Sequence, residues 1–480
     1  MRYAMILLGA LGLAAPYALK AEPALPETVT FSKDIAPILQ RSCQNCHRPN
    51  GVAPMSLVAY DEVRPYAKAI NQRTHIGPHR GVMPPWYVEK NIGIQHFKDD
   101  PSLSEVELAK ITKWADGGAP QGNPADMPPA RTFQSQDSWN IGQPDLIVST
   151  QEVLVKANTP DWWGEIPSVP VGLAEDRYVS ALQVREVNDI PNDGTGRSTV
   201  GGHYVFHHVI WSTAPIAAPS GSDAPAVSVP ALGGGTSWPI HEVGRNADFL
   251  DPEAGRLLKT GSQVVSNSVH LHSNGRDTKA HLEIGFKFHP KGYKPTVQQA
   301  LVALGNGVDI DIRPNEANQQ LHAYAVTQTN VKIVSFEPHL HAPGDRMCLE
   351  AIWGSTIQTL NCVGYDHNWV RGYDYAEDAA PLLPKGTILH IIGYMDNSPS
   401  NKNIPDPRNW QGSGNRSVAN MFIDLGQRVS LTDEQFQAEM AKRREQLHLT
   451  RNDLVIGCPL CSLAFAPAPV RPPAAAGGGR

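Results

Sequence analysis

Short β-rich runs, broken by turn residues, are the feature that most restricts how residues 146–430 can fold. Runs such as RYVSALQVREV, HYVFHHVIWST and TILHIIGYM are rich in β-branched and aromatic residues, and turn residues recur at intervals of roughly 8–15 positions. This pattern is typical of an antiparallel β sandwich or jelly roll. Glycine and proline number 41 each, which also favours loop-rich β structure over long helices. Because the stretch is long for one sandwich, we expect two.

The remaining segments divide the 480-residue chain further. A proline-rich stretch without periodicity precedes the β region and is predicted to be a linker. After the β region, Thr432 and Gln435 form the capping-box pattern that predicts the start of a helix, and the end of the chain is predicted to be disordered. The predicted divisions are a linker at 123–145, a first β domain at 146–300, a second at 301–430, and the helix with its tail at 431–480.

The first 21 residues predict an exported protein. Arg2 precedes an apolar run from Met5 to Ala15, and small residues follow up to Ala21, where cleavage is expected. The apolar run is too short to span a bilayer, and no later segment is long enough either. We therefore expect a periplasmic chain with no transmembrane segment. The formal charge of −6 and the absence of basic runs argue against nucleic acid as a partner.

The motif CQNCH predicts a covalently bound c-type heme, because Cys43 and Cys46 can bond the porphyrin and His47 follows directly as an iron ligand. Residues 28–122 resemble a small, all-α cytochrome c domain, with an opening helix, an MPPW loop and an amphipathic closing helix. That resemblance favours Met83 as the second axial ligand, where a thioether suits an electron carrier. The alternatives are Met55, His75 and His79.

Two further cysteine pairs are present. Cys348 and Cys362 flank a stretch whose turn centre lies midway between them, so a hairpin would bring them close enough for a bridge. Cys458 and Cys461 have no histidine after them, and a disulfide, a redox pair and a metal clip all remain open.

Paired histidines in the β region suggest metal binding. His339 and His341 are two positions apart, so in a strand they share a face. His207 and His208 are adjacent and could share one metal only at a bulge or a strand end. Another pair lies in SVHLHSNG. Imidazole suits zinc, copper, iron and nickel, and a nearby methionine favours copper.

Several ordered segments resemble a known family. FHHVIW, SVHLHSNG, EPHLHAPG and NRSVANMFIDLG are similar to segments of the copper type II, ascorbate-dependent monooxygenases, which include peptidylglycine α-hydroxylating monooxygenase and dopamine β-monooxygenase. YDHNWVRGY and MDNSPSNKNIPDP also look like bacterial relatives fused to cytochrome c. The resemblance implies two consecutive jelly-roll-like domains with one copper each. The expected architecture is thus a small all-α cytochrome c domain followed by two antiparallel β-sandwich domains.

The resemblance also assigns ligands. In the family, an all-histidine copper relays electrons and a second copper, with two histidines and a methionine, activates dioxygen. Spacing to Gly275 selects His270 for the first site, although His272 is also well placed. The sequence lacks the dense disulfides of the animal enzymes, and their substrate-binding residues cannot be located in it. The implied ligands are His207, His208 and His270 at the first copper and His339, His341 and Met421 at the second, which is the catalytic one.

The implied function is hydroxylation of a C–H bond of a small organic substrate with dioxygen, with electrons from an ascorbate-like reductant or a redox protein. We hypothesise that the heme delivers electrons to the copper sites. The main alternative is a non-catalytic heme/copper electron-transfer or copper-handling protein. A zinc hydrolase and a β scaffold with surface histidines are further alternatives. Met421 argues against zinc, because a thioether is a soft ligand.

Overall fold

The computed structural model describes residues 25–49, 51, 53–133, 138–190, 200–216, 235–243, 245, 247–300, 304–414, 419–450 and 453–462. The predicted signal peptide and the predicted disordered end of the chain lie outside these residues. Strands dominate the described part, and helices account for 15%. Among the described helices, none has the length and apolar character needed to cross a membrane.

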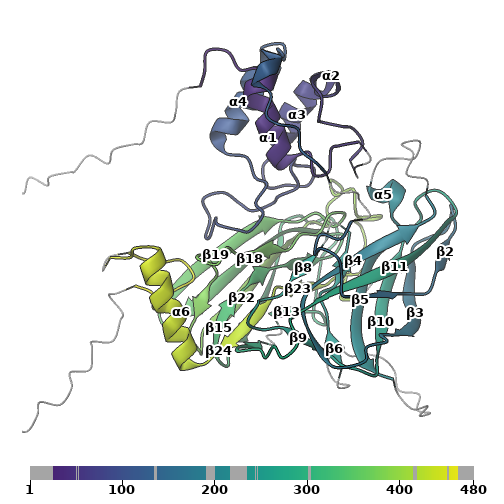
Figure 1. The fold of residues 1–480 in the computed structure, drawn as a ribbon, viewed down its shortest axis with the longest axis vertical. Helices are drawn as coiled ribbons and strands as arrows, with labels where there is room; N and C mark the ends of the chain where they lie inside the picture. Colours follow the sequence, from purple (N-terminus) through teal and green to yellow (C-terminus); the bar gives the residue numbers. More distant parts are fainter. Residues whose placement is uncertain are drawn as a thin grey trace, which may run out of the picture.

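The helices lie mainly before residue 127, above the sheets in Figure 1. They pack around an apolar cluster that includes Phe31, Leu39 and Trp114. Helix α4 begins after Ser104, whose side chain accepts a hydrogen bond from the Glu107 amide in a capping box. The elements are η1 (Phe31–Ile35), α1 (Ala36–Ser42), α2 (Tyr60–Val63), η2 (Arg64–Tyr66), α3 (Ala67–Thr74), α4 (Glu105–Asp116) and η3 (Pro124–Asp126).

The expected fold class, a small all-α cytochrome c domain followed by two sandwiches, is wrong. The described chain is mostly antiparallel sheet with few short helices, and no sizeable all-α N-terminal domain is present. Proline and glycine between residues 76 and 98 interrupt the helices, and this stretch contributes to the β core instead. Trp86 and Phe97 are buried there, and Val88 forms a β-bridge with Val363.

The first β half contains two antiparallel sheets that share one apolar core, around Trp211, Leu282 and Phe286. One sheet comprises β1 (Leu146–Ser149), β2 (Val153–Val155), β4 (Arg177–Asn188), β8 (Asp248–Phe249), β9 (Arg256–Leu258) and β11 (Thr278–Phe288). The other comprises β3 (Trp162–Pro170), β5 (Phe206–Pro215), β6 (Thr236–Ser237), β7 (His241–Glu242) and β10 (Ser262–Leu271). A short helix, α5 (Val200–His203), precedes β5.

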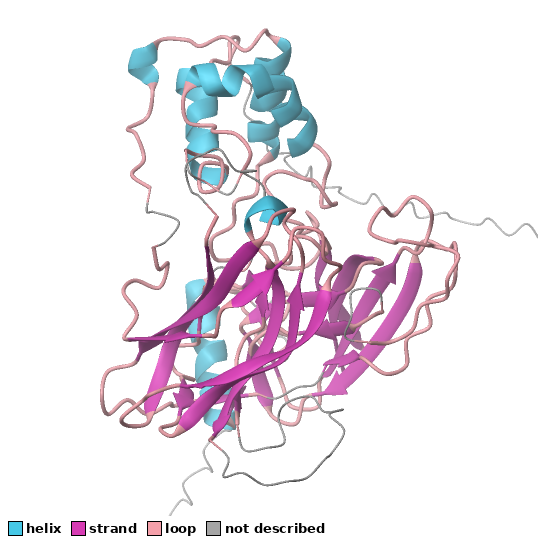
Figure 2. Cartoon of the chain, turned by 90° about the vertical axis from the view of Figure 1, so that its right-hand side faces the viewer, coloured by secondary structure: helices cyan, strands magenta, loops and turns pink. Residues whose placement is uncertain are grey.

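The second β half has a separate core, around Phe336, Leu349 and Phe422, and lies beside the first half (Figures 1 and 2). Its largest ladder joins β14 (Gln319–Val326), β22 (Ile388–Met395), β18 (Gly344–Trp353) and β19 (Thr356–Gly364). A second sheet joins β12 (Gln298–Gln299), β24 (Arg428–Leu431), β15 (Asn330–Ile333) and β21 (Leu382–Leu383). Smaller ladders join β13 (Leu304–Asn306), β23 (Phe422–Asp424) and β17 (Pro338–Leu340), and β16 (Ser335–Phe336) with β20 (Tyr373–Asp374).

Two disulfides and one helix complete the second half. Cys348 and Cys362 lie opposite each other in the β18–β19 hairpin and are bridged, as their spacing around a turn suggested. Cys458 and Cys461 are also bridged, so this pair is neither a free dithiol nor a metal clip in the structure. Helix α6 (Asp433–Gln446) begins after Thr432, as the capping box predicted.

Candidate metal centre

A bulge at the start of β5 turns two adjacent histidines toward the same region. In the β10–β5 ladder, His270 pairs with His208, but the next residue of β10, Leu271, pairs with Phe206. His207 is therefore the extra residue at this register shift. Without a bulge, neighbouring side chains of a strand point to opposite faces. The bulge therefore allows His207 and His208 to point the same way, which they would have to do to bind one metal.

Three imidazoles converge there. One nitrogen each from His207, His208 and His270 lies within 4.8 Å of the others. His270 is fixed on both sides, since its Nε2 bonds Asp161 Oδ2 at 3.0 Å and Trp163 stacks on its ring at 4.4 Å. The Nδ1 atoms of His207 and His270 are buried with no hydrogen-bond partner. Buried polar atoms normally have partners, so these two atoms fit metal ligands.

His272, the alternative to His270, lies outside this group. Its Nε2 bonds the carbonyl oxygen of Tyr204 at 2.9 Å, and its ring centroid is 6.3 Å from that of His270. The structure thus brings His270 rather than His272 together with His207 and His208.

A second histidine pair lies on β17 and just after it. The ring centroids of His339 and His341 are 5.4 Å apart. His339 Nδ1 bonds Glu242 Oε1 at 2.7 Å, and His341 Nδ1 bonds the Ala419 carbonyl at 3.0 Å. Both Nδ1 atoms are therefore engaged, and the Nε2 atoms are the ones that a metal could use.

The pairing of β17 with β23 determines where Met421 lies relative to the second histidine pair. β17 pairs with β23 as far as Leu340 and Phe422, and His341 and Met421 are the residues that directly flank this last pair. The Met421 side chain is half-buried. These two residues, 80 positions apart in sequence, therefore lie at the same end of one ladder, each next to its last paired residue.

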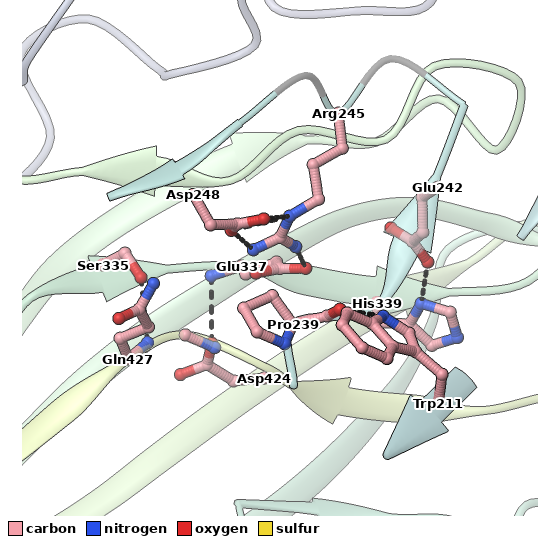
Figure 3. Close-up of polar contacts among 11 residues, drawn as sticks. Trp211, Pro239, Glu242, Arg245, Asp248, Ser335, Glu337, His339, Asp424 and Gln427 are labelled. Carbon is pink, nitrogen blue, oxygen red and sulfur yellow. Dashed lines mark hydrogen bonds and ion pairs between the residues drawn. The ribbon is translucent and has the colours of Figure 1, made fainter. Parts of the chain in front are cut away.

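Glu242 connects the two β halves. It lies on β7, where it pairs with His208, and its buried carboxylate accepts from His339 in the other half (Figure 3). Burial would raise the pKa of Glu242, but His339 and Arg245 outweigh burial, and the pKa is lowered. The carboxylate is thus ionised and fixes His339 with Nδ1 protonated.

Arg245 extends this network. Its guanidinium bonds both Asp248 and Glu337, and Glu337 donates its backbone N–H to Asp424 Oδ1 at 3.0 Å (Figure 3). Asp424 closes β23, the strand that follows Met421. Charged groups therefore tie β7, β17 and β23 together around the histidines.

The two histidine groups are neighbours. A further histidine, His367, lies between them, with its ring centroid 5.0 Å from that of His207 and 6.2 Å from that of His341. This histidine lies in YDHNWVRGY, a segment that resembles the bacterial relatives, but the resemblance assigns it no role. A single histidine has no partner at a fixed spacing that would indicate a metal site. Only its position inside a segment that resembles the family could have indicated a role.

The cluster is electrically suited to cations. Burial is the main cause that lowers the pKa of His207, His208, His270 and His367, and neighbouring imidazoles lower each of these pKa values further. Asp161 acts in the opposite direction on the pKa of His270. The pKa of His367 falls to about 4. These imidazoles are therefore neutral near pH 7, and a neutral imidazole is the form that binds a metal.

The heme motif follows the end of α1. Cys43 and Cys46 are half-buried and not bridged to each other, and the His47 amide donates to the Cys43 carbonyl at 3.0 Å. His47 Nδ1 bonds the Met55 carbonyl at 3.2 Å, which leaves Nε2 available for iron. Burial raises the pKa of Cys43 to about 12 and also raises that of Cys46. These residues fit the thioether attachment and axial ligation of a c-type heme.

The second axial ligand stays a prediction. Met83 is 38% exposed in a loop that its amide ties to the Arg73 carbonyl at 3.2 Å. Met55 packs against the apolar cluster of the helices. His75 has both ring nitrogens engaged, with the Asn71 carbonyl at 2.7 Å and Thr112 Oγ1 at 3.3 Å.

One loop approaches both sites. The segment between β19 and β20 carries His367 near one end and Arg371 near the other. The Arg371 guanidinium lies over the Trp86 ring at 5.4 Å, and its charge acts on the Cys46 thiol. Tyr87 Oη donates to Asp366 Oδ2 at 3.4 Å. The loop that carries His367 therefore also contacts Trp86 and Tyr87 of the N-terminal stretch.

No protein-family model matches the sequence, and a search of curated proteins found no significant relative.

Proposed function

We propose that the chain is a copper-dependent monooxygenase that hydroxylates a C–H bond of a small organic substrate with dioxygen, as the resemblance to the copper type II monooxygenases implies. The observation that carries the proposal is the convergence of two histidine groups, from β5, β10 and β17, in one buried region. In support, His341 and Met421 directly follow and precede the last paired residues of β17 and β23, Leu340 and Phe422.

The donor set favours copper over zinc. Three imidazoles suit a copper that changes oxidation state, and two imidazoles with a thioether suit Cu(I). Asp161 orients His270, Glu242 orients His339, and the Ala419 carbonyl orients His341. Such outer partners set which nitrogen faces the metal and hold the ring in place.

When bound, two copper ions and one covalent heme c would supply the redox chemistry that inserts one oxygen atom into the substrate. The electrons would come from an ascorbate-like reductant or a redox protein. Burial keeps the ligand histidines largely out of solvent, and it lowers the pKa of His207 and His208 so that these two imidazoles are neutral near pH 7. The predicted signal peptide and the two disulfides together support a periplasmic location, because disulfides persist in oxidising compartments.

Metal analysis and labelled dioxygen test the proposal. The purified protein should hold two coppers and one heme, and candidate substrates should gain one labelled oxygen atom. Met421→His should retain copper but change oxygen reactivity, because it replaces a soft ligand by a harder one. Copper with oxygen-independent electron transfer only would favour the non-catalytic alternative, and zinc alone would overturn both.

The role of the heme needs a separate test. Reduced protein mixed with dioxygen in a stopped-flow instrument should show heme oxidation during copper turnover. A heme that stays reduced while the copper sites turn over would rule out electron delivery through it.

A further inference from the structure

We propose that a chain of three buried side-chain amides positions His341 and Met421, two proposed ligands of the second copper. The chain consists of Asn420, Gln411 and Asn397, and Gln411 is its central positioning residue. The inference rests on the proposed copper function. Asn397 and Asn420 lie in MDNSPSNKNIPDP and NRSVANMFIDLG, two segments that carry the family resemblance, but the resemblance assigns them no role.

The chain begins at the segment that serves both ligands. The Ala419 carbonyl accepts a hydrogen bond from His341 Nδ1 at 3.0 Å, and Met421 is two residues further along. Asn420 is peptide-bonded to both Ala419 and Met421. A shift of Asn420 would therefore move the carbonyl that orients one ligand and the residue that offers the thioether of the other.

Asn420 is held by its backbone and by its side chain. It is fully buried, its amide donates to the Gly412 carbonyl at 2.9 Å, and its carbonyl accepts from the Gly414 amide at 3.0 Å. Its Nδ2 donates to Gln411 Oε1 at 3.2 Å and lies 3.5 Å from the Gly412 carbonyl oxygen. The contact with Gln411 is thus the closer of these two side-chain contacts.

Gln411 connects this segment to the core of the second half. Its backbone amide and carbonyl both bond Ile312, at 3.0 Å each, and Ile312 is fully buried in that core. The Gln411 side chain is buried too, accepts from Asn420 through Oε1, and donates from Nε2 to Asn397 Oδ1 at 3.1 Å. One side chain therefore uses both ends of its amide to join two others.

Asn397 ends the chain on backbone groups. It lies two residues after β22, is fully buried, and donates from Nδ2 to the carbonyls of Arg313 and Asn409, at 3.1 and 3.0 Å. Its own backbone amide donates to the Glu316 carbonyl at 2.9 Å. Each of the three side-chain amides thus donates in the same direction. Because an unpaired buried amide costs free energy, the intact chain favours one position of Asn420.

The test measures sulfur ligation in protein that carries only the second copper. In a His207→Ala/His208→Ala background, X-ray absorption of the Cu(I) form should show one sulfur neighbour, which Met421 provides. Gln411→Leu breaks both links of the amide chain. It should therefore weaken or remove the sulfur contribution and lower Cu(I) affinity about tenfold or more.

A control and two further variants separate positioning from folding. Gln183→Leu is the matched control, because Gln183 is 5% exposed and accepts from the Asn140 amide at 2.6 Å in the first half. It should leave the sulfur contribution and the Cu(I) affinity unchanged. Gln411→Glu keeps an oxygen that accepts from Asn420, so it should retain the sulfur contribution that Gln411→Leu loses. Asn397→Ala removes only the outer link and should lower the affinity by less.

The outcomes distinguish this inference from the proposed function. A folded Gln411→Leu protein with unchanged sulfur contribution and affinity overturns the inference but leaves the proposed function intact. An equal loss in folded Gln183→Leu or Gln411→Glu protein also overturns it, because the effect would then not depend on the link to Asn420. If Gln411→Leu does not fold, unchanged ligation and affinity in Asn397→Ala overturn it. Failure of the unmodified protein to bind copper overturns the proposed function itself.

Discussion

At the scale of single residues, the centre depends on carboxylates that face histidines or backbone amides. Glu242 is 3% exposed and bonds His339 from the opposite β half. Glu186 lies at the end of β4 and accepts from the amides of Val205 and Phe206, at 3.0 and 2.8 Å. The first contact sets the ring orientation of His339, a proposed ligand. The second fixes the start of β5, the strand that carries two other proposed ligands, His207 and His208.

Glu242→Gln should weaken copper binding at the His339/His341/Met421 site by about tenfold to 100-fold, because the amide orients and polarises His339 less than a carboxylate does. Copper titration against a competing chelator measures the effect. Glu283→Gln is the control, since Glu283 pairs with Arg185 within one sheet. Equal affinities in all three proteins would contradict the positioning role.

Glu186 predicts a pH dependence of stability. Burial raises its pKa from 4.5 to about 7, although hydrogen bonds from Asn188, Phe206 and Val205 act in the opposite direction. The folded chain therefore holds this proton more tightly than the unfolded chain. The stabilisation is full below about pH 4.5 and is lost as the pH rises through about 7, by at most about 3 kcal/mol.

Glu186→Gln should remove this dependence. The melting temperature of the metal-free protein, measured relative to that of the variant, should fall between about pH 5 and about pH 8. Parallel melting curves for the two proteins across this range would show that Glu186 does not titrate there.

At the scale of elements, the local sequence pattern determines which strands and helices form, whereas the pairing register determines which of their residues meet. The β runs and the two capping boxes are visible in the sequence, because alternation and caps are local properties. The bulge that joins His207 to His208 and His270 depends on how β5 pairs with β10. The placement of Met421 and His341 at the same end of one ladder depends likewise on the pairing of β23 with β17.

The β18–β19 disulfide should stabilise its hairpin. Cys348 and Cys362 are 14 positions apart, so Cys348→Ala/Cys362→Ala should lower the free energy of unfolding by about 3 kcal/mol. The Cys458–Cys461 disulfide closes a much shorter loop, so Cys458→Ala/Cys461→Ala should lower the free energy of unfolding by about 2 kcal/mol or less. Thermal melts of both variants measure the difference, and a larger loss in the second variant would contradict the loop-length argument.

At the scale of the whole molecule, the N-terminal stretch is part of the β architecture. Trp86 contacts Phe97 and Tyr373 edge-on, at centroid distances of 5.7 and 5.0 Å. Arg346 pairs with Glu89 across the same boundary, and the Glu89 amide donates to the Cys362 carbonyl at 2.9 Å. The N-terminal part of the chain therefore does not form an independent unit on a flexible tether.

Trp86→Ala should destabilise the protein by about 3–5 kcal/mol, because it removes a buried aromatic ring from the core of the second half. Trp410→Ala is the control, since that ring is 60% exposed, and its cost should be much smaller. Urea unfolding, monitored by the signal of the β region, checks both. A loss confined to the helical signal would show that Trp86 does not belong to the β core.

The sequence by itself determined the β-rich character, the positions of the caps, and the residue types that can hold a metal or a heme. It could also indicate the Cys348–Cys362 bridge, because a symmetric hairpin places both residues opposite each other. These properties follow from spacing within one segment.

Only the tertiary structure decided which histidines meet. The choice of His270 over His272, the place of Glu242 beside His339, and the approach of His367 all depend on contacts between segments far apart in the chain. It also decided that residues between 82 and 98 belong with the β core. The physical reason is that pairing register and burial against distant strands select one contact among several that local sequence permits equally.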